Sequence, residues 1–249
     1  MRDISEVLLP NSLAYILERK KVKQHRRTFR HAALGFTEKI STGLRSLDRA
    51  MKGGIGVGSL TGFIGAFGSG KSQLCHQLAV MVQLPVEEGG LASGAVYVDT
   101  EGDFRPERLA AMAEYRGLDP QHALENTIYI RTHDWKELVH VIRESSSKLI
   151  IVDSLSWLFR GAESKKEAYR LRSIMYSILA LALEWTVKNE GIFIFSSHGY
   201  KQKSFGDPYV SLFALVRLWT ARNRDKVQIT CWGREINAVI TEGGIIDED

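Results

Sequence analysis

The chain has 249 residues, of which 44% are hydrophobic and 25% are charged, so wholesale disorder, collagen and a small disulfide scaffold are excluded. The longest apolar stretch, Ile174–Leu183, is shorter than the roughly 20 residues of a membrane span, and we expect no membrane association. Cys75 and Cys231 are the only cysteines and lack zinc-ligand spacing. The first ten residues do not read as a secretory signal. These features predict a protein of the reducing cytoplasm.

Positive charge gathers at the start of the chain. Residues 1–36 hold 8 Lys/Arg against 3 Asp/Glu, whereas the rest holds 25 against 26, so the net charge of +4 arises from this N-terminal arm. A cationic segment beside a nearly neutral body suits a polyanion such as nucleic acid, and a solvated linker is the alternative. We expect a basic arm over residues 1–36 and one domain over residues 37–249.

From residue 40 onward, short apolar runs alternate with helical patterns. Runs this continuously apolar are typical of strands buried on both faces, as in a parallel sheet covered by helices. The final segment, Leu215–Thr241, has short runs separated by turns, which predicts antiparallel strands. We therefore predict an α/β fold with a mostly parallel sheet. The predicted strands are Ser59–Gly65, Gly94–Thr100, Lys148–Ser154 and Gly191–Ser197, and the predicted helices are Lys71–Gln83, Pro106–Gly117, Asp134–Ser145 and Lys166–Asn189.

The segment GAFGSGKS (Gly65–Ser72) fits the pattern G-x-x-x-x-G-K-[ST] and stands between a predicted strand and a predicted helix. Its glycines let backbone N–H groups turn inward around phosphate oxygens, where the helix N-terminus adds partial positive charge. Lys71 would reach the β- and γ-phosphates, and the Ser72 hydroxyl suits Mg²⁺. A purely structural glycine turn is the alternative. The predicted nucleotide-binding residues are Gly65, Ala66, Phe67, Gly68, Ser69, Gly70, Lys71, Ser72, Gln73 and Arg108.

Two acidic residues follow predicted strands. Asp153 ends the run KLIIVD, and a charge buried there is costly unless it has a partner. We therefore predict that Asp153 and Ser72 form the Mg²⁺ site. An N-cap of the next helix is the alternative role for Asp153. Glu101 follows the run GAVYV, and its carboxylate can deprotonate the water that attacks the γ-phosphate if both strands end at one edge. Capping or a salt bridge is the alternative for Glu101. Arg108 either stacks on a base or is solvated.

The stretch Gly53–Leu109, which includes the phosphate loop and DTEGDFRPER, resembles the ATPase core of the RecA/RadA strand-exchange recombinases, most strongly the archaeal RadA branch. Ile40–Ile55 before it, and LIIVDS, FRGAE and SFGDP after it, extend the resemblance to about residues 38–245. The resemblance implies a three-layer RecA-like core that uses ATP and Mg²⁺. It also implies that Glu101 and Lys71 are catalytic and that Arg108 stacks on adenine.

The sequence departs from this family at four places. Only the short arm precedes the core, so we expect no helical DNA-binding domain there. The family's Asn-Gln pair, whose glutamine senses the γ-phosphate, is replaced by His198 and Gly199, and His198 either substitutes as sensor or is structural. The second DNA-binding loop is shortened after SFGDP, and Thr230–Val239 lacks the Asp-x-Pro segment that caps ATP across a subunit interface. We therefore predict slow ATP hydrolysis.

Two segments, Phe159–Arg172 and His198–Tyr209, supply candidate DNA contacts. The first supplies cations, which follow phosphates, and the second interleaves cations with aromatic rings, which stack on bases, as in proteins that bind single strands without sequence preference. The resemblance implies DNA loops at these two places. A solvated helix face is the alternative for Arg170 and Arg172. The candidate residues are Arg160, Lys165, Lys166, Arg170, Arg172, Tyr200, Lys201, Lys203 and Phe205.

These features and the resemblance predict an ATP-binding RadA paralogue with slow ATPase activity, which binds single-stranded DNA and modulates a RadA-type recombinase in DNA repair. FRHA (Phe29–Ala32) resembles the Phe-x-x-Ala motif by which family members dock on a neighbouring subunit. This segment either serves self-association or partner docking, or simply anchors the arm. The alternative functions are a full strand-exchange recombinase and a non-hydrolysing, nucleotide-gated binding module. A hexameric helicase-like motor is disfavoured, because we expect no partner domain.

Overall fold

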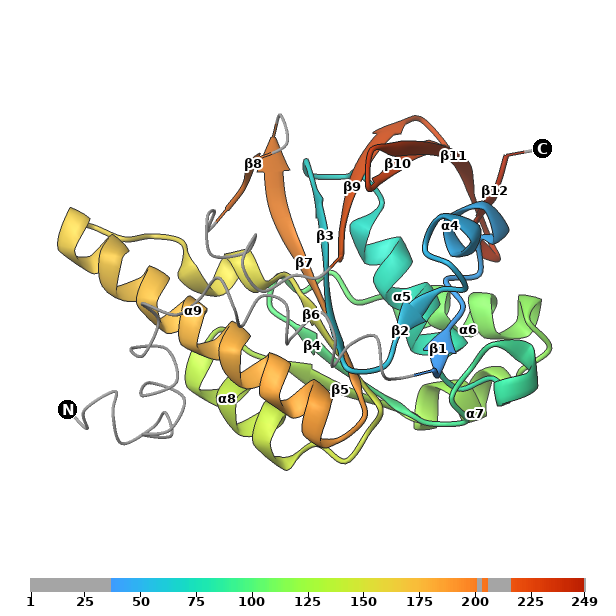
Figure 1. Ribbon diagram of the computed structural model, residues 1–249, viewed down its shortest axis with the longest axis horizontal. Coiled ribbons are helices and arrows are strands. Elements are labelled where there is room, and N and C mark those ends of the chain that lie inside the picture. Colours follow the sequence, from blue (N-terminus) through green and yellow to red (C-terminus); the bar gives the residue numbers. More distant parts are fainter. Residues whose placement is uncertain (1–36, 201–202, 206–215, 249) are drawn as a thin grey trace.

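The computed structural model describes residues 37–200, 203–205 and 216–248, so the predictions for the arm, for FRHA (Phe29–Ala32) and for Lys201 lie outside the described residues. Figure 1 shows the arrangement of the elements. The helices are α4 (Arg45–Ala50), α5 (Lys71–Met81), α6 (Pro106–Tyr115), α7 (Pro120–Glu125), α8 (Trp135–Glu144) and α9 (Lys165–Lys188), with the 3₁₀ helices η2 (Val86–Glu88) and η3 (Leu155–Phe159). The strands are β1 (Lys39–Ile40), β2 (Ile55–Gly56), β3 (Ser59–Gly65), β4 (Ala95–Asp99), β5 (Thr127–Arg131), β6 (Leu149–Asp153), β7 (Ile192–Tyr200), β8 (Lys203–Ser204), β9 (Val216–Asn223), β10 (Lys226–Cys231), β11 (Arg234–Thr241) and β12 (Gly244–Asp247).

One large sheet forms the centre of the domain. Its strands lie in the order β12-β11-β10-β9-β3-β7-β6-β4-β5. The neighbours from β9 to β5 run parallel, whereas β10, β11 and β12 continue from β9 in antiparallel fashion. Three short strands lie apart from this order: β8 folds back on β7, and β1 pairs with β2. The predicted mostly parallel α/β sheet with antiparallel C-terminal strands is confirmed.

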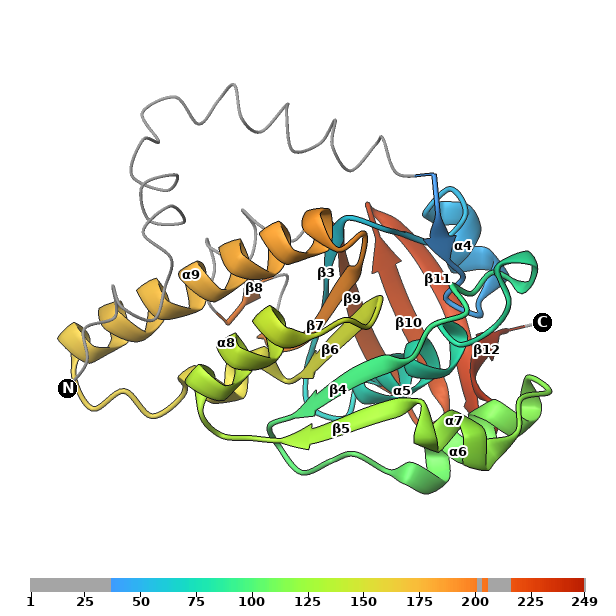
Figure 2. The same cartoon turned by 90° about the horizontal axis from the view of Figure 1, so that it is seen from below.

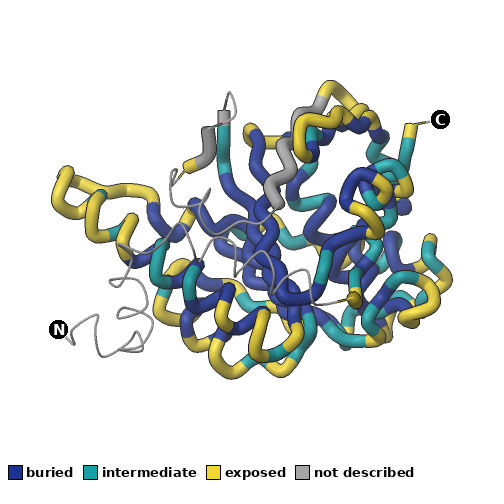
Figure 3. Tube along the Cα trace, in the orientation of Figure 1, coloured by how far each residue is buried: buried dark blue, intermediate teal, exposed yellow. Residues whose placement is uncertain are grey.

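Helices cover both faces of this sheet (Figure 2). On one face, Leu78 of α5 packs in a buried cluster with Tyr97 of β4. On the other face, Leu138 of α8 and Ile178 of α9 share a cluster with Phe193 of β7. Every residue of β3, β4 and β6 is buried, as the burial colours of Figure 3 show for the centre of the molecule. Burial on both faces explains why these strands read as continuous apolar runs.

Several elements had no counterpart among the predictions, among them β5, α4 and α7. The strand β5 lies at the edge of the sheet; its apolar run, residues 128–130, is short, and Ile128 and Tyr129 are exposed. The helices α4 and α7 have six residues each, which is too short to show a helical period. In α7 the Asp119 side chain accepts a hydrogen bond from the His122 N–H, so a cap rather than a pattern defines the helix start.

The longest helix, α9, has 24 residues and two distinct parts. Its first turns extend beyond the sheet and are largely exposed, whereas the part from Ile174 onward packs on the sheet (Figures 1 and 3). The Ser164 side chain caps its start by accepting a hydrogen bond from the Glu167 N–H. Among the described residues, none of the helices, α9 included, combines the length and apolarity that a membrane crossing requires.

Candidate active site at the carboxyl edge of the sheet

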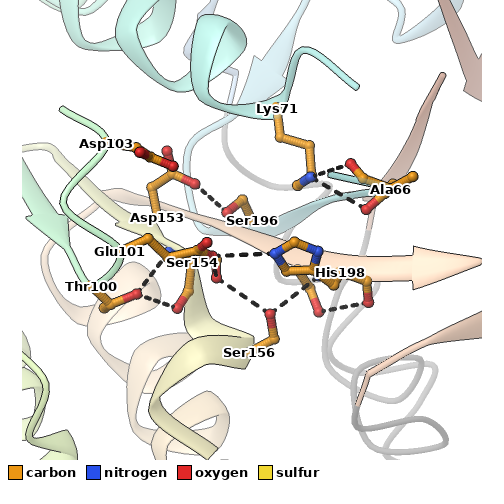
Figure 4. A network of polar contacts seen from close by, with 12 residues as sticks. Ala66, Lys71, Thr100, Glu101, Asp103, Asp153, Ser154, Ser156, Ser196 and His198 are labelled. Carbon is orange, nitrogen blue, oxygen red and sulfur yellow. Dashed lines mark hydrogen bonds and ion pairs between the residues drawn. The ribbon is translucent and has the colours of Figure 1, made fainter. Parts of the chain in front are cut away.

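Four neighbouring strands bring their carboxyl ends to one edge of the sheet. Lys71 follows β3, Glu101 follows β4, Asp153 ends β6 and His198 lies near the end of β7. The strand register places Gly65 opposite His198 and Asp99 opposite Asp153. Figure 4 shows the side chains of Lys71, Glu101, Asp153 and His198 gathered in this region. Ligands of open α/β sheets bind at such an edge, so the predicted catalytic and metal-binding side chains lie in one candidate site.

The loop from β3 to α5 has the conformation that its glycines permit. Gly68 and Gly70 have φ values of +70° and +96°, in the left-handed region that favours glycine. Gly65 instead completes β3, and Gly70 precedes the first residue of α5. Ala66, Phe67 and Gly68 are exposed at the tip of the loop. The N-terminus of the 11-residue helix α5 therefore starts where an anion would meet the backbone N–H groups of this loop.

The Lys71 ammonium lies inside this loop. Its Nζ donates hydrogen bonds to the carbonyl oxygen of Ala66 at 2.7 Å and to that of Gly65 at 3.3 Å (Figure 4). Only 6% of Lys71 is exposed, and burial lowers the pKa of its ammonium, while the negative charges of Asp153 and Glu101 partly offset this effect. A cation held by neutral carbonyls and weakly compensated by two carboxylates is well suited to bind an anionic phosphate.

Asp153 and Ser72 fit the donor set that Mg²⁺ prefers. Asp153 is 7% exposed, and its carboxylate receives hydrogen bonds from two neutral hydroxyls, those of Tyr97 at 2.8 Å and of Ser196. The half-buried Ser72 lies at the start of α5. Oxygen ligands and a small number of protein contacts are typical of Mg²⁺, which keeps several of its waters. No group of three or more His, Cys, Asp or Glu side chains that could hold a metal ion occurs in the described part of the chain.

The Tyr97–Asp153 contact gives a testable stability effect. Burial raises the pKa of Tyr97 well above its ordinary value, and the charge of Asp153 raises it further, so the hydroxyl stays protonated and donates. Without nucleotide, Tyr97→Phe is expected to lower the free energy of unfolding by about 1–3 kcal/mol, because a buried carboxylate loses a donor. Urea unfolding measures this change.

Tyr129→Phe is the matched control. Its hydroxyl donates to Asp99 at 3.1 Å, but four backbone N–H groups also bind that carboxylate. Losing one donor of five is expected to cost less than about 1 kcal/mol. Equal losses in the two variants would contradict the role given to Tyr97.

Asp99 shapes the loop that carries Glu101. Its carboxylate accepts hydrogen bonds from four successive backbone N–H groups, those of residues 101–104, at 2.7–3.3 Å. Asp99 is 1% exposed, so this buried charge is satisfied by the turn that it organises. Asp99 was not among the predicted site residues. An aspartate that ends a strand and is followed by Thr-Glu-Gly is a turn signal that could have identified it.

The Glu101 carboxylate is bound by two side chains from other strands. Its Oε1 accepts a hydrogen bond from the Ser154 hydroxyl and lies 3.3 Å from His198 Nε2 (Figure 4). Burial lowers the pKa of His198, as do the charges of Lys71 and Arg160, against the opposing effect of Glu101. A neutral imidazole can donate from Nε2 to the carboxylate. His198, whose two alternative roles are a sensor of the γ-phosphate and a structural residue, therefore faces the candidate catalytic group.

A cluster of aromatic rings joins α5 to the Glu101 loop. The His76 ring stacks on Phe104 with centroids 5.1 Å apart and lies 5.2 Å from the Tyr97 ring. Its Nδ1 donates to the Ser72 carbonyl at 2.6 Å, and its Nε2 accepts the Arg105 N–H at 3.0 Å. Burial lowers the pKa of His76, which favours the neutral ring that these two bonds require. His76 thus fixes the start of α5 relative to the segment that carries Glu101.

Arg108 lies between three elements. Its guanidinium donates to the Gln73 side chain of α5 at 2.8 Å and 3.2 Å, and to the carbonyls of Thr241 at 2.7 Å and Glu242 at 3.1 Å. These bonds use the edge of the guanidinium, whereas a base would stack on its flat face. Two of the predicted nucleotide-binding residues, Gln73 and Arg108, therefore contact each other beside the phosphate loop.

The candidate DNA-binding residues fall into two groups. Arg160, Lys165, Lys166, Arg170 and Arg172 are all exposed near the start of α9. In the second group, the backbone of Tyr200 pairs with that of Lys203, and Phe205, 37% exposed, donates its N–H to the His198 carbonyl at 2.8 Å. Two exposed aromatic residues beside the first group, Trp157 and Tyr169, were not among the predictions. Trp157 was hidden within the apolar run LSWLF.

Comparison with known proteins agrees with this architecture. The family model described as Rad51 matches residues 36–187, which is more than half of the chain and includes the phosphate loop, Glu101 and Asp153. Over 146 residues the chain is 47% identical to the DNA repair and recombination protein RadA of Ignicoccus hospitalis, a match that covers 54% of this chain and 45% of that protein. The chain thus spans about half the length of this curated relative. On the extent of the family match, the chain belongs to the Rad51 family.

Proposed function

We propose that this chain binds ATP with Mg²⁺ and hydrolyses it slowly. The observation that carries the proposal is the meeting of Lys71, Glu101 and Asp153 at one edge of the sheet, beside the N-terminus of α5. The loop amides and Lys71 bind the phosphates, and Arg108 offers its flat face to the adenine. Ser72 and Asp153 would hold Mg²⁺, which would neutralise phosphate charge. Glu101 orients the attacking water and accepts its proton.

Two features support slow ATP hydrolysis, and the first is the set of hydrogen bonds to Glu101. Its Oε1 already accepts hydrogen bonds from Ser154 and His198, so a water molecule competes with both for this carboxylate. The β10–β11 hairpin closes over two residues, because Cys231 pairs directly with Arg234, and this turn leaves no room for an ATP-capping segment. Both features support slow hydrolysis.

We further propose that the chain binds single-stranded DNA and modulates a RadA-type recombinase in DNA repair. Two observations support this role: the exposed cations near the start of α9 and the 47% identity to a protein named for DNA repair and recombination. Self-association or docking through FRHA (Phe29–Ala32) belongs to the same proposal.

A non-hydrolysing, nucleotide-gated binding module is the second candidate. The contacts of Glu101 with Ser154 and His198 favour it, because a carboxylate bound this way can report the presence of a γ-phosphate without acting as a base. Substitutions of Glu101 and Lys71 separate the two candidates by comparing phosphate release with nucleotide binding. A full strand-exchange recombinase is the remaining alternative, and helical filaments formed with ATP and DNA would support it.

The DNA-binding part of the proposal predicts a steep salt dependence. If Arg160, Lys165, Lys166, Arg170 and Arg172 each neutralise one phosphate, the logarithm of the binding constant should fall with the logarithm of salt concentration at a slope of about −3.5. Fluorescence anisotropy of a labelled oligonucleotide measures this slope. Lys165→Ala combined with Lys166→Ala should flatten it by about 1.4.

Lys188→Ala is the control for this titration, because Lys188 is exposed at the opposite end of α9. Its slope should equal that of the unmodified chain. A binding constant that does not respond to salt would contradict phosphate contacts on this surface.

A further inference from the structure

The 3₁₀ helix η3 carries one exposed ring on an otherwise buried segment. Leu155, Leu158 and Phe159 are buried, whereas Trp157 is 41% exposed. A 3₁₀ helix has three residues per turn, so Trp157 and Arg160 lie on the same side. The Arg160 N–H donates to the Trp157 carbonyl at 3.3 Å, and its guanidinium carbon lies 4.9 Å from the centroid of the indole ring. The indole ring of Trp157 is therefore exposed on a helix with a buried side, and the Arg160 guanidinium lies beside it.

The surroundings of this pair are positively charged. Between residues 157 and 173 the chain has five Lys/Arg and two Asp/Glu. The five cations are all exposed, and Tyr169, 67% exposed, lies among them on the first turns of α9. An exposed indole beside cations combines a surface for a flat apolar ring with charges for phosphates.

We propose that Trp157 is a stacking platform for a base of single-stranded nucleic acid, with Arg160 binding a phosphate next to that base. This inference rests on the proposed DNA-binding function and deepens it, because it names the residue that contacts a base. The charge of the surface selects a polyanion, and the indole ring selects one with accessible bases rather than a paired duplex. Stacking of this kind tolerates any base, so no sequence preference follows.

The platform lies close to the candidate active site. Ser156, in the same 3₁₀ helix, accepts the His198 N–H at 3.2 Å and contacts the Ser154 hydroxyl at 3.3 Å, and Ser154 donates to Glu101. The charge of Arg160 also contributes to the lowered pKa of His198 and of Lys71. Nucleic acid on Trp157 would therefore lie within electrostatic reach of Glu101 and Lys71.

Oligonucleotides with and without bases test the platform. Oligo(dT) and an abasic oligonucleotide of the same length are titrated at one salt concentration, in the presence of ATP and Mg²⁺. Trp157→Ala should weaken oligo(dT) binding by about 5- to 100-fold, because stacking on one aromatic ring contributes that much per base. Abasic binding should be unchanged, and Trp157→Phe should retain part of the preference for bases. Trp232→Ala, which removes an indole 58% exposed on the β10–β11 turn, should bind oligo(dT) like the unmodified chain.

Three results would overturn the platform. The first is that Trp157→Ala binds oligo(dT) as tightly as the unmodified chain does. If the thermal stability of this variant also falls, another segment of this chain covers the indole ring. The second is equal affinity of the unmodified chain for oligo(dT) and the abasic oligonucleotide. The third is the absence of binding to either oligonucleotide, which refutes the DNA-binding part of the proposed function as well. The first two results leave that function standing, so the failure of each proposal is distinguishable.

Discussion

Replacing Glu101 by glutamine is expected to lower the rate of ATP hydrolysis by about 10²- to 10⁴-fold while leaving ATP binding intact. The amide keeps the size of the side chain and an oxygen that can accept from Ser154, so the loop organised by Asp99 should persist. It cannot take the proton of the attacking water. Phosphate release under saturating ATP and Mg²⁺ measures the rate, and fluorescence of a labelled ATP analogue measures the affinity.

Glu107→Gln is the control for this substitution. Glu107 is an exposed carboxylate in the first turn of α6, six residues along the chain from Glu101. Its removal should leave phosphate release unchanged. Identical rates for the unmodified chain and Glu101→Gln would remove the catalytic assignment and favour the non-hydrolysing module.

Lys71→Ala is expected to weaken ATP binding so strongly that an ATP concentration 100 times the Kd of the unmodified chain no longer saturates the variant. Hydrogen bonds to charged groups contribute about 1.5–3 kcal/mol each, so losing this ammonium should weaken binding by about 100-fold or more. The weaker binding also reduces the amount by which ATP raises the free energy of unfolding. At an ATP concentration 100 times its Kd, the unmodified chain gains about 2.7 kcal/mol, whereas a variant with 100-fold weaker affinity gains about 0.4 kcal/mol. Urea unfolding with and without ATP and Mg²⁺ measures both gains.

Lys148→Ala controls for the loss of a lysine as such. The Lys148 ammonium donates to the Asn189 carbonyl at 3.1 Å and lies 3.9 Å from Glu190, and Lys148 immediately precedes β6, at the end of the sheet opposite the candidate site. ATP should stabilise this variant as much as the unmodified chain. If ATP stabilised Lys71→Ala by the same amount, the phosphate-loop assignment would have to be withdrawn.

The central strands and the phosphate loop could be predicted because their signals are local. A strand buried on both faces is mostly apolar, as in β3 and β6, although β3 also buries Ser59 and Thr61. The loop from Gly65 to Ser72 is contiguous, so its glycines, its lysine and the following helix are visible together in the sequence. The edge strand β5 was not predicted in this way, because it has only three consecutive apolar residues, and Ile128 and Tyr129 are exposed.

The candidate site was only partly predictable. Glu101 and Asp153 could be placed together from the rule that parallel strands end at one edge, and the register of Asp99 with Asp153 agrees with that rule. Asp99 has a local turn signal, because its backbone partners are residues 101–104, but it was not among the predicted residues. The role of His76 could not be predicted, because the ring accepts a hydrogen bond from the backbone of Arg105, 29 residues later.

The sequence by itself determined the layered α/β fold, the position of the phosphate loop and the identity of the charged groups near it. These follow from periodicity and from short contiguous motifs, which need no knowledge of strand order. Only the tertiary structure decided what holds Glu101: Ser154 and His198 lie 53 and 97 residues away from it in sequence. It also decided that Trp157 is exposed beside Arg160. Such contacts depend on which strands become neighbours and on how far each element is covered, and these are properties of the packed chain.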